Sequence, residues 1–155
     1  MTKLQHDILN ILRNDGSVSK EEIAKTLGKT PEEIKKELRD MTDKGIIVKY
    51  IAVVNDEKAD EDTVEALVEV KISSEKSTQF DKIAAKICKF PEVKDVFLMS
   101  GSYDLSVAVV GKSLREVSRF VQEHLAQVDT VISTATHFIL KCYKMSGVTI
   151  DPAKK

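Results

Sequence analysis

The 155-residue chain has no tryptophan and only two cysteines, three prolines and six glycines. Cys88 and Cys142 are 54 positions apart, which is not the spacing of a metal-binding pair, so we expect two free thiols packed as small hydrophobic side chains. No apolar run approaches the length of a membrane span, and the first residues, Met-Thr-Lys-Leu, lack the apolar stretch of a signal peptide. These absences predict a cytoplasmic protein with no membrane partner.

An excess of charge of one sign is also missing, since 24 basic residues stand against 25 acidic ones. A chain with this balance can bind nucleic acid only through a local basic patch. The sequence has no phosphate-binding glycine loop with a lysine, no zinc-type Cys/His spacing and no nucleophile elbow, and its three histidines (His6, His124 and His137) are scattered. We therefore expect no enzyme activity, no cofactor and no metal site.

Apolar side chains recur at helical spacing in three short segments before residue 45. Two of these helices begin at capping boxes, Ser19 with Glu22 and Thr30 with Glu33, in which the two side chains satisfy backbone N–H groups reciprocally. Residues 46–48 and 50–54 are rich in β-formers and predict a strand or a two-stranded wing. This order predicts a winged helix-turn-helix over residues 1–54. The expected inward-facing residues are Leu4, Ile8, Ile11, Leu12, Ile23, Ala24, Leu27, Ile34, Leu38 and Met41.

A different pattern follows a polar stretch at residues 55–63, which has no period and is interpreted as a linker. Its clustered acids lack the spacing and the turn glycine of a calcium loop. Residues 64–148 then predict elements in the order β-α-β-β-α-β, with a third capping box at Ser113 and Glu116. This order is the ferredoxin-like arrangement, so the fold class is α+β, with residues 149–155 as a tail.

The last predicted strand, residues 131–145, is apolar on both of its faces. One face holds Ile132, Thr134, Thr136, Phe138, Leu140 and Cys142, and the other holds Val131, Ala135, Ile139, Tyr143 and Met145. Two helices cover only one face of such a sheet. A second copy of the domain would cover the outer face, which predicts a homodimer.

Two features together point to a known family. One is the N-terminal run that includes DILNIL at residues 7–12, NDGSVSKEEIAKTLG at residues 14–28 and KGIIVKYIAVVN at residues 44–55. The other is a Gly-Ser-Tyr-Asp turn at residues 101–104, between two strands of the β-α-β-β-α-β domain. The chain resembles the Lrp/AsnC family of leucine-responsive and asparagine-operon regulators over residues 3–148. The resemblance implies a DNA-binding first domain and a second domain of the RAM/AsnC type. That second domain dimerises, builds octamers and holds an amino-acid effector between subunits near the turn.

The second helix of a helix-turn-helix enters the major groove of double-stranded DNA, and here it is the helix at residues 31–44. Its outward face carries two positive and three negative charges, from Lys36, Arg39, Glu32, Asp40 and Asp43. In the family that the chain resembles, arginine is common at the positions of Glu37 and Asp40. The predicted DNA-binding residues are Lys20, Lys29, Thr30, Lys35, Lys36, Arg39 and Lys49.

Two further groups are candidates for DNA contacts. Free N–H groups around Thr30 can hold a phosphate, and Glu32 or Glu33 can accept a hydrogen bond from cytosine N4. The alternative interpretation is a solvated helix of mixed charge, with pairs such as Glu32 and Lys36.

The predicted effector-binding residues are Gly101, Ser102, Tyr103, Asp104, Thr134 and Thr136. Asp104 would hold an α-ammonium group, backbone N–H groups of the turn would hold a carboxylate, and the two threonines would add hydroxyl contacts. The alternative is a plain hairpin turn with an Asx hydrogen bond, which the same residue types favour.

Two rival functions stay open. The siroheme decarboxylases resemble the same two-domain family, but they would need arginine and histidine side chains around a large pocket, and this chain has only four dispersed arginines, Arg13, Arg39, Arg115 and Arg119. The other rival is a family member that senses a ligand without useful DNA binding, for which the acidic helix at residues 31–44 is the support.

Overall fold

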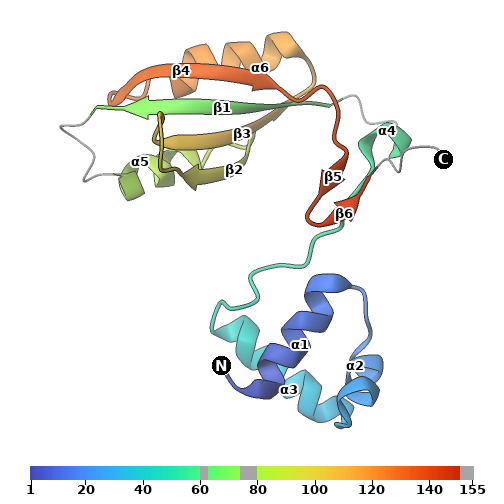
Figure 1. The fold of residues 1–155 in the computed structure, drawn as a ribbon. Coiled ribbons are helices and arrows are strands. Elements are labelled where there is room, and N and C mark those ends of the chain that lie inside the picture. Colours follow the sequence, from blue (N-terminus) through green and yellow to red (C-terminus); the bar gives the residue numbers. More distant parts are fainter. Residues whose placement is uncertain (60–62, 74–79, 151–155) are drawn as a thin grey trace. The chain divides into compact units, whose positions relative to one another are not determined.

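A computed structural model of the chain describes residues 1–59, 63–73 and 80–150. The chain divides into two compact units, Met1–Ala52 and Val53–Lys155 (Figure 1). Within the described residues, no helix is long and apolar enough to cross a membrane.

The N-terminal unit consists of α1 (Lys3–Asn14), α2 (Lys20–Leu27) and α3 (Pro31–Asp43). Their apolar faces meet in a core of Ile8, Ile23, Ala24, Ile34, Met41 and Ile47, with Leu4, Ile11, Leu12, Leu27 and Leu38 packed against it. The inward-facing residues predicted from helical spacing are therefore confirmed. Helices of this length are marginally stable in isolation. Burial of these side chains therefore supplies the stability that holds the three short helices together.

Capping boxes begin all three helices of this unit. The predicted boxes at Ser19 with Glu22 and at Thr30 with Glu33 are present. The sequence analysis missed a third box, in which Thr2 and Gln5 cap α1. The Thr-x-x-Gln pattern at residues 2–5 is its sequence signal.

The predicted strand or wing after α3 is wrong for this segment. Residues 44–55 are described throughout and contain no strand. Ile47 is buried in the core, whereas Val48, Tyr50 and Ile51 are exposed. Their β-propensity is not realised because a strand needs a partner for its backbone groups, and this segment has none in its own unit.

The second unit has a four-stranded antiparallel sheet in the order β2-β3-β1-β4 (Figure 1). Its strands are β1 (Val64–Ile72), β2 (Val93–Leu98), β3 (Leu105–Gly111) and β4 (Val131–Phe138), and its helices are α5 (Phe80–Ile87) and α6 (Leu114–Phe120). A π-helical turn, Val121–Leu125, continues α6. This is the predicted ferredoxin-like α+β arrangement.

The core of this unit lies between the two helices and one face of the sheet. It contains Ala66, Val68 and Val70 of β1, Val107 and Val109 of β3, and Ile83, Ile87, Val117 and Phe120 of the helices. The alternation along β1 therefore places Ala66, Val68, Val70 and Ile72 toward the helices and Glu65, Leu67 and Glu69 on the outer face.

The last strand is shorter than predicted. β4 ends at Phe138, which pairs with Ala66, and the N–H of Ile139 still donates to the carbonyl of Glu65. Because β1 begins at Val64, the chain runs out of partners there and leaves the sheet. It then forms a separate hairpin of β5 (Lys144–Met145) and β6 (Val148–Thr149).

Two local expectations also need correction. Glu116 accepts from the N–H of Lys112 at 2.7 Å, so the third capping box keeps only its Ser113 half. Cys88 is exposed instead of packed, while Cys142 is partly buried. Within the predicted linker, α4 (Asp56–Ala59) is helical, and residues 60–62 lie outside the described residues.

Candidate DNA-binding and effector sites

The seven predicted DNA-binding residues are all exposed in the N-terminal unit: Lys20, Lys29, Thr30, Lys35, Lys36, Arg39 and Lys49. Lys35, Lys36 and Arg39 lie on α3, Lys29 and Thr30 immediately precede it, and Lys20 is the first residue of α2. Five of the seven thus lie on α3 or directly before it, whereas Lys20 belongs to α2 and Lys49 follows α3 in the chain.

The start of α3 is less open to a phosphate than its sequence suggests. The N–H of Thr30 donates to the Glu33 carboxylate at 2.9 Å, and the N–H of Glu33 donates to the Thr30 hydroxyl at 3.2 Å. The Thr30 N–H is the main reason why the pKa of Glu33 lies below its usual value. These two N–H groups already have partners, so phosphate binding at this helix start would use other donors.

The charges of α3 also pair differently from the Glu32–Lys36 pair expected under the alternative of a solvated helix of mixed charge. Among the described residues, the ion pairs of this region are Lys29–Glu33 at 3.7 Å, Arg39–Asp43 at 3.8 Å and Asp40–Lys44 at 2.7 Å. The Lys44 ammonium is the main reason why the pKa of Asp40 lies below its usual value. All are surface pairs, which contribute little stability and leave the cations available to exchange partners.

Asp40 and Glu37 have a further partner that sequence analysis did not find. Gln5 of α1 is 5 % exposed, and its amide nitrogen donates to Glu37 at 2.8 Å and to Asp40 at 3.0 Å. Asp40 was expected to face outward, but its carboxylate lies at the seam between α1 and α3. No local pattern predicts this contact, because the partners are 32 and 35 residues apart.

The predicted effector turn connects β2 to β3. The carboxylate of Asp104 accepts from the N–H of Ile72 at 2.7 Å, and the N–H of Asp104 donates to the carbonyl of Val70 at 3.0 Å. Asp104 thus ties the turn to the end of β1 instead of making an Asx bond within the turn. Gly101 has φ 151°, and a Cβ there would meet no atom within 4 Å, so space is open beside it.

Thr134 and Thr136 lie on the opposite side of β1 from this turn. Thr134 pairs with Val70 and Thr136 with Val68, so both threonines share the helix-covered face and are half-buried. Since Asp104 also bonds to Val70, the structure brings Asp104 and Thr134 to the same end of the sheet.

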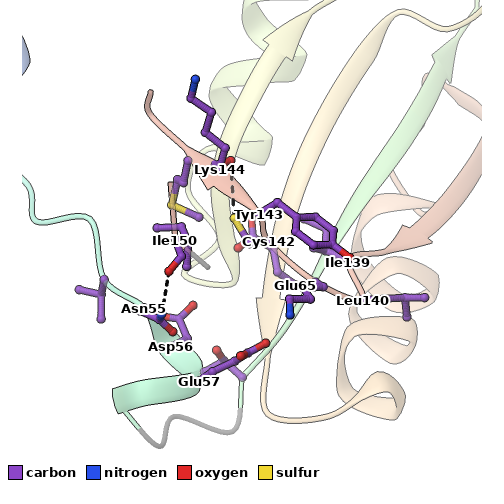
Figure 2. Close-up of a pocket in the computed structure, with 14 residues that line it drawn as sticks. Asn55, Asp56, Glu57, Glu65, Ile139, Leu140, Cys142, Tyr143, Lys144 and Ile150 are labelled. Carbon is purple, nitrogen blue, oxygen red and sulfur yellow. Dashed lines mark hydrogen bonds between the residues drawn. The ribbon is translucent and has the colours of Figure 1, made fainter. Parts of the chain in front are cut away.

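A pocket of about 530 Å³ lies at the other end of the sheet in the same unit (Figure 2). Its walls come from residues 54–57 before β1 and from the segment that follows β4, and the amide of Asn55 donates to the carbonyl of Ile150 at 3.1 Å. Glu65 near the start of β1 lines it and pairs with Lys94 at 2.8 Å, a contact that raises the pKa of Lys94. None of the predicted effector residues lines this pocket, although its size suits a small molecule.

No metal site emerges from the part of the chain that the structure describes, where no three His, Cys, Asp or Glu side chains converge. The four arginines that a tetrapyrrole site would need are spread over α1, α3 and α6.

Comparisons with known proteins cover both units. Residues 1–48 match the winged helix-turn-helix DNA-binding family, and residues 65–149 match the Lrp/AsnC ligand binding domain. The chain is 39% identical over 152 residues to an uncharacterised HTH-type transcriptional regulator of Bacillus subtilis, YugG, covering 97% of this chain and 92% of that one.

Solved structures show the same fold. The AsnC structure from E. coli aligns with a TM-score of 0.70 and 22% identity over 94% of this chain and 95% of that one. A transcriptional regulator from Neisseria meningitidis, solved as a complex with L-methionine, aligns with a TM-score of 0.73 and 24% identity over 94% and 93% of the two chains.

Proposed function

Because the chain belongs to the Lrp/AsnC family of transcriptional regulators, we propose that it binds specific sites on double-stranded DNA in the cytoplasm and that an amino acid controls this binding. The observation that carries the proposal is the joining of a helix-turn-helix unit, with exposed cations around α3, to an Lrp/AsnC ligand binding domain in one chain. A regulator of this kind needs no catalytic group, and we propose regulation instead of an enzyme activity.

DNA contact is assigned to α3 and its surroundings. Lys35, Lys36 and Arg39 are the exposed cations of the helix that a helix-turn-helix inserts into the major groove. A homodimer would present two such helices, so the DNA site is expected to be roughly palindromic. Because few cations face the duplex, affinity should be modest, and it should fall with salt in proportion to the small number of phosphate contacts.

The test is binding to genomic fragments at about 50 and 200 mM salt, the range over which phosphate contacts weaken. Lys36→Ala and Arg39→Ala should each weaken binding, because each removes one phosphate partner. Lys82→Ala removes the same charge from an exposed site on α5 and should change nothing. If no fragment binds wild-type protein at low salt, the ligand-sensing alternative without DNA binding replaces this proposal.

The effector site is assigned to the turn at residues 101–104 together with Thr134 and Thr136. The turn offers an acid for an ammonium group, and Gly101 leaves open space beside it. The related regulator from Neisseria meningitidis binds L-methionine, which supports an amino acid as the ligand class. A partner subunit closing over the turn would couple binding of the amino acid to assembly, as dimer or octamer.

Asp104→Asn is the informative variant, since an asparagine oxygen can still accept from Ile72 while the negative charge is gone. Thermal-shift screening of the twenty amino acids should find a ligand for wild-type protein, and Asp104→Asn should abolish the shift. A ligand that binds Asp104→Asn unchanged would contradict the assignment and direct attention to the pocket of Figure 2.

A further inference from the structure

The amide of Gln5 uses both of its ends. Its oxygen accepts from the N–H of Thr2 at 3.0 Å and completes the cap of α1. Its nitrogen donates to the carboxylates of Glu37 and Asp40, on α3. A carboxylate could not donate and an ammonium group could not accept, whereas the glutamine amide performs both tasks.

The two carboxylates that Gln5 holds matter for the charge of α3. The helix has three basic residues, Lys35, Lys36 and Arg39, against five acidic ones, Glu32, Glu33, Glu37, Asp40 and Asp43. Glu33 is held at the helix start by Thr30, and Asp43 is paired with Arg39. Glu37 and Asp40 lie three residues apart, on the side of α3 that meets α1, and Glu37 is about one turn from each of the core residues Ile34 and Met41.

These positions leave the two carboxylates at the border between the α1–α3 seam and the outer side of the helix. The Asp40 side chain is 39% exposed, and the neighbouring Lys36 is exposed. Asp40 is also paired with Lys44 at 2.7 Å, so without the Gln5 donor Glu37 is the carboxylate more free to rotate outward, where DNA phosphates would repel it.

We infer that Gln5 is a positioning residue for DNA binding: it holds the carboxylates of Glu37 and Asp40 against α1 and so keeps two negative charges off the DNA-facing side of α3. This inference rests on the proposed role of α3 in DNA binding. It explains how a helix with more acids than bases can still present Lys35, Lys36 and Arg39 to a polyanion.

Gln5→Glu is the sharpest variant. The new carboxylate keeps the acceptor for Thr2 but stands beside two like charges, which expels Glu37 and Asp40 from the seam. We expect the Kd for the fragment that wild-type protein binds most tightly to rise about five- to tenfold at low salt. Gln5→Leu, of similar size and suited to a buried position, removes the donors without adding charge and should raise Kd less.

The double variant Glu37→Gln with Asp40→Asn provides the readout that a purely structural role would not move. In this neutral background the Gln5→Leu change should alter Kd by less than about twofold. Gln5→Glu should also be tolerated there, because its carboxylate can accept from the two new amides. Thr2→Ala, which removes the hydroxyl acceptor of the α1 cap but leaves the Gln5 amide and its contacts to α3, is the control and should leave Kd unchanged.

Circular dichroism of the full chain verifies that each variant is folded. If Gln5→Glu is not folded, the comparison is made with Gln5→Leu alone. A loss of affinity that is relieved in the neutral background supports the inference. Unchanged affinity in both Gln5 variants, or an equal loss in both backgrounds, overturns it and leaves the proposed function standing. Failure of wild-type protein to bind any fragment overturns both.

Discussion

Asp104 forms hydrogen bonds within the protein that do not depend on a ligand. Its carboxylate accepts the N–H of Ile72, at the point where the pairing of β1 with β4 shifts register. The N–H of Met99 donates to the Asp104 carbonyl at 2.8 Å, so this residue closes its own turn and also ties the turn to β1. A residue that holds the turn in place is also well situated to hold a ligand rigidly, which is what a binding site requires.

Asp104→Ala should therefore destabilise the C-terminal unit, and this effect must be separated from loss of ligand binding. We expect a loss of about 1–3 kcal/mol in the free energy of unfolding, because the partly buried N–H of Ile72 loses its acceptor. Hydrogen exchange of the Ile72 amide should accelerate in Asp104→Ala and much less in Asp104→Asn. Equal exchange rates in wild type and Asp104→Ala would show that the bond contributes nothing.

At the scale of the element, the cap of α3 links the stability of the recognition helix to pH. The pKa of Glu33 lies below its usual value of 4.5, chiefly because the N–H of Thr30 donates to its carboxylate. A carboxyl group whose pKa is lowered by folding stabilises the folded state above its unfolded-state pKa. That contribution is lost as the pH falls through the lowered pKa.

Acidification below about pH 4.5 should therefore loosen the start of α3 in wild-type protein more than in Glu33→Gln. Glu32→Gln, at the neighbouring exposed position, is the matched control and should retain the wild-type pH dependence. The measurement is amide hydrogen exchange of residues 31–35 in the full chain between pH 3 and 6, a range that brackets carboxyl titration, corrected for intrinsic exchange. If Glu33→Gln has the same pH profile as wild-type protein, the Glu33 cap is not the cause of the pH dependence.

At the scale of the whole molecule, the outer face of the sheet carries its exposed apolar residues on some strands and not on others. β4 turns Ser133, Ala135 and His137 to this face, so β4 itself is less apolar there than its sequence pattern suggested. The exposed apolar residues of this face are instead Leu67 of β1, 42% exposed, and Phe97 of β2, 56% exposed. A second copy of the chain that covers them is the proposed dimer.

Light scattering of the full chain at micromolar concentration should give a dimer or a multiple of it. The double change Leu67→Lys with Phe97→Glu should shift the population toward monomer, because it places charges in the proposed interface. Leu114 on α6 is 56% exposed, as Phe97 is, and lies outside the outer sheet face. Leu114→Lys is therefore the control and should not change the mass. A wild-type monomer at this concentration would contradict the dimer.

Local patterns in the sequence determined most of the architecture. Helical spacing located α1, α2 and α3, and the pairs Ser19–Glu22 and Thr30–Glu33 marked where two of them begin. The alternation in β1 and the order of elements indicated the ferredoxin-like unit. These features could be predicted because each depends on residues a few positions apart, whose backbone conformation sets which side chains share a face.

Only the tertiary structure decided the features that join distant residues. The end of β4 follows from where β1 begins, the acidic pair of α3 is held by Gln5, and the carboxylate of Asp104 is taken up by β1. Likewise, the β-rich residues after α3 stay unpaired because their unit offers no strand to join. The physical reason is common to all of them: a hydrogen bond between segments 30 or more residues apart depends on how packed elements meet, which no local periodicity records.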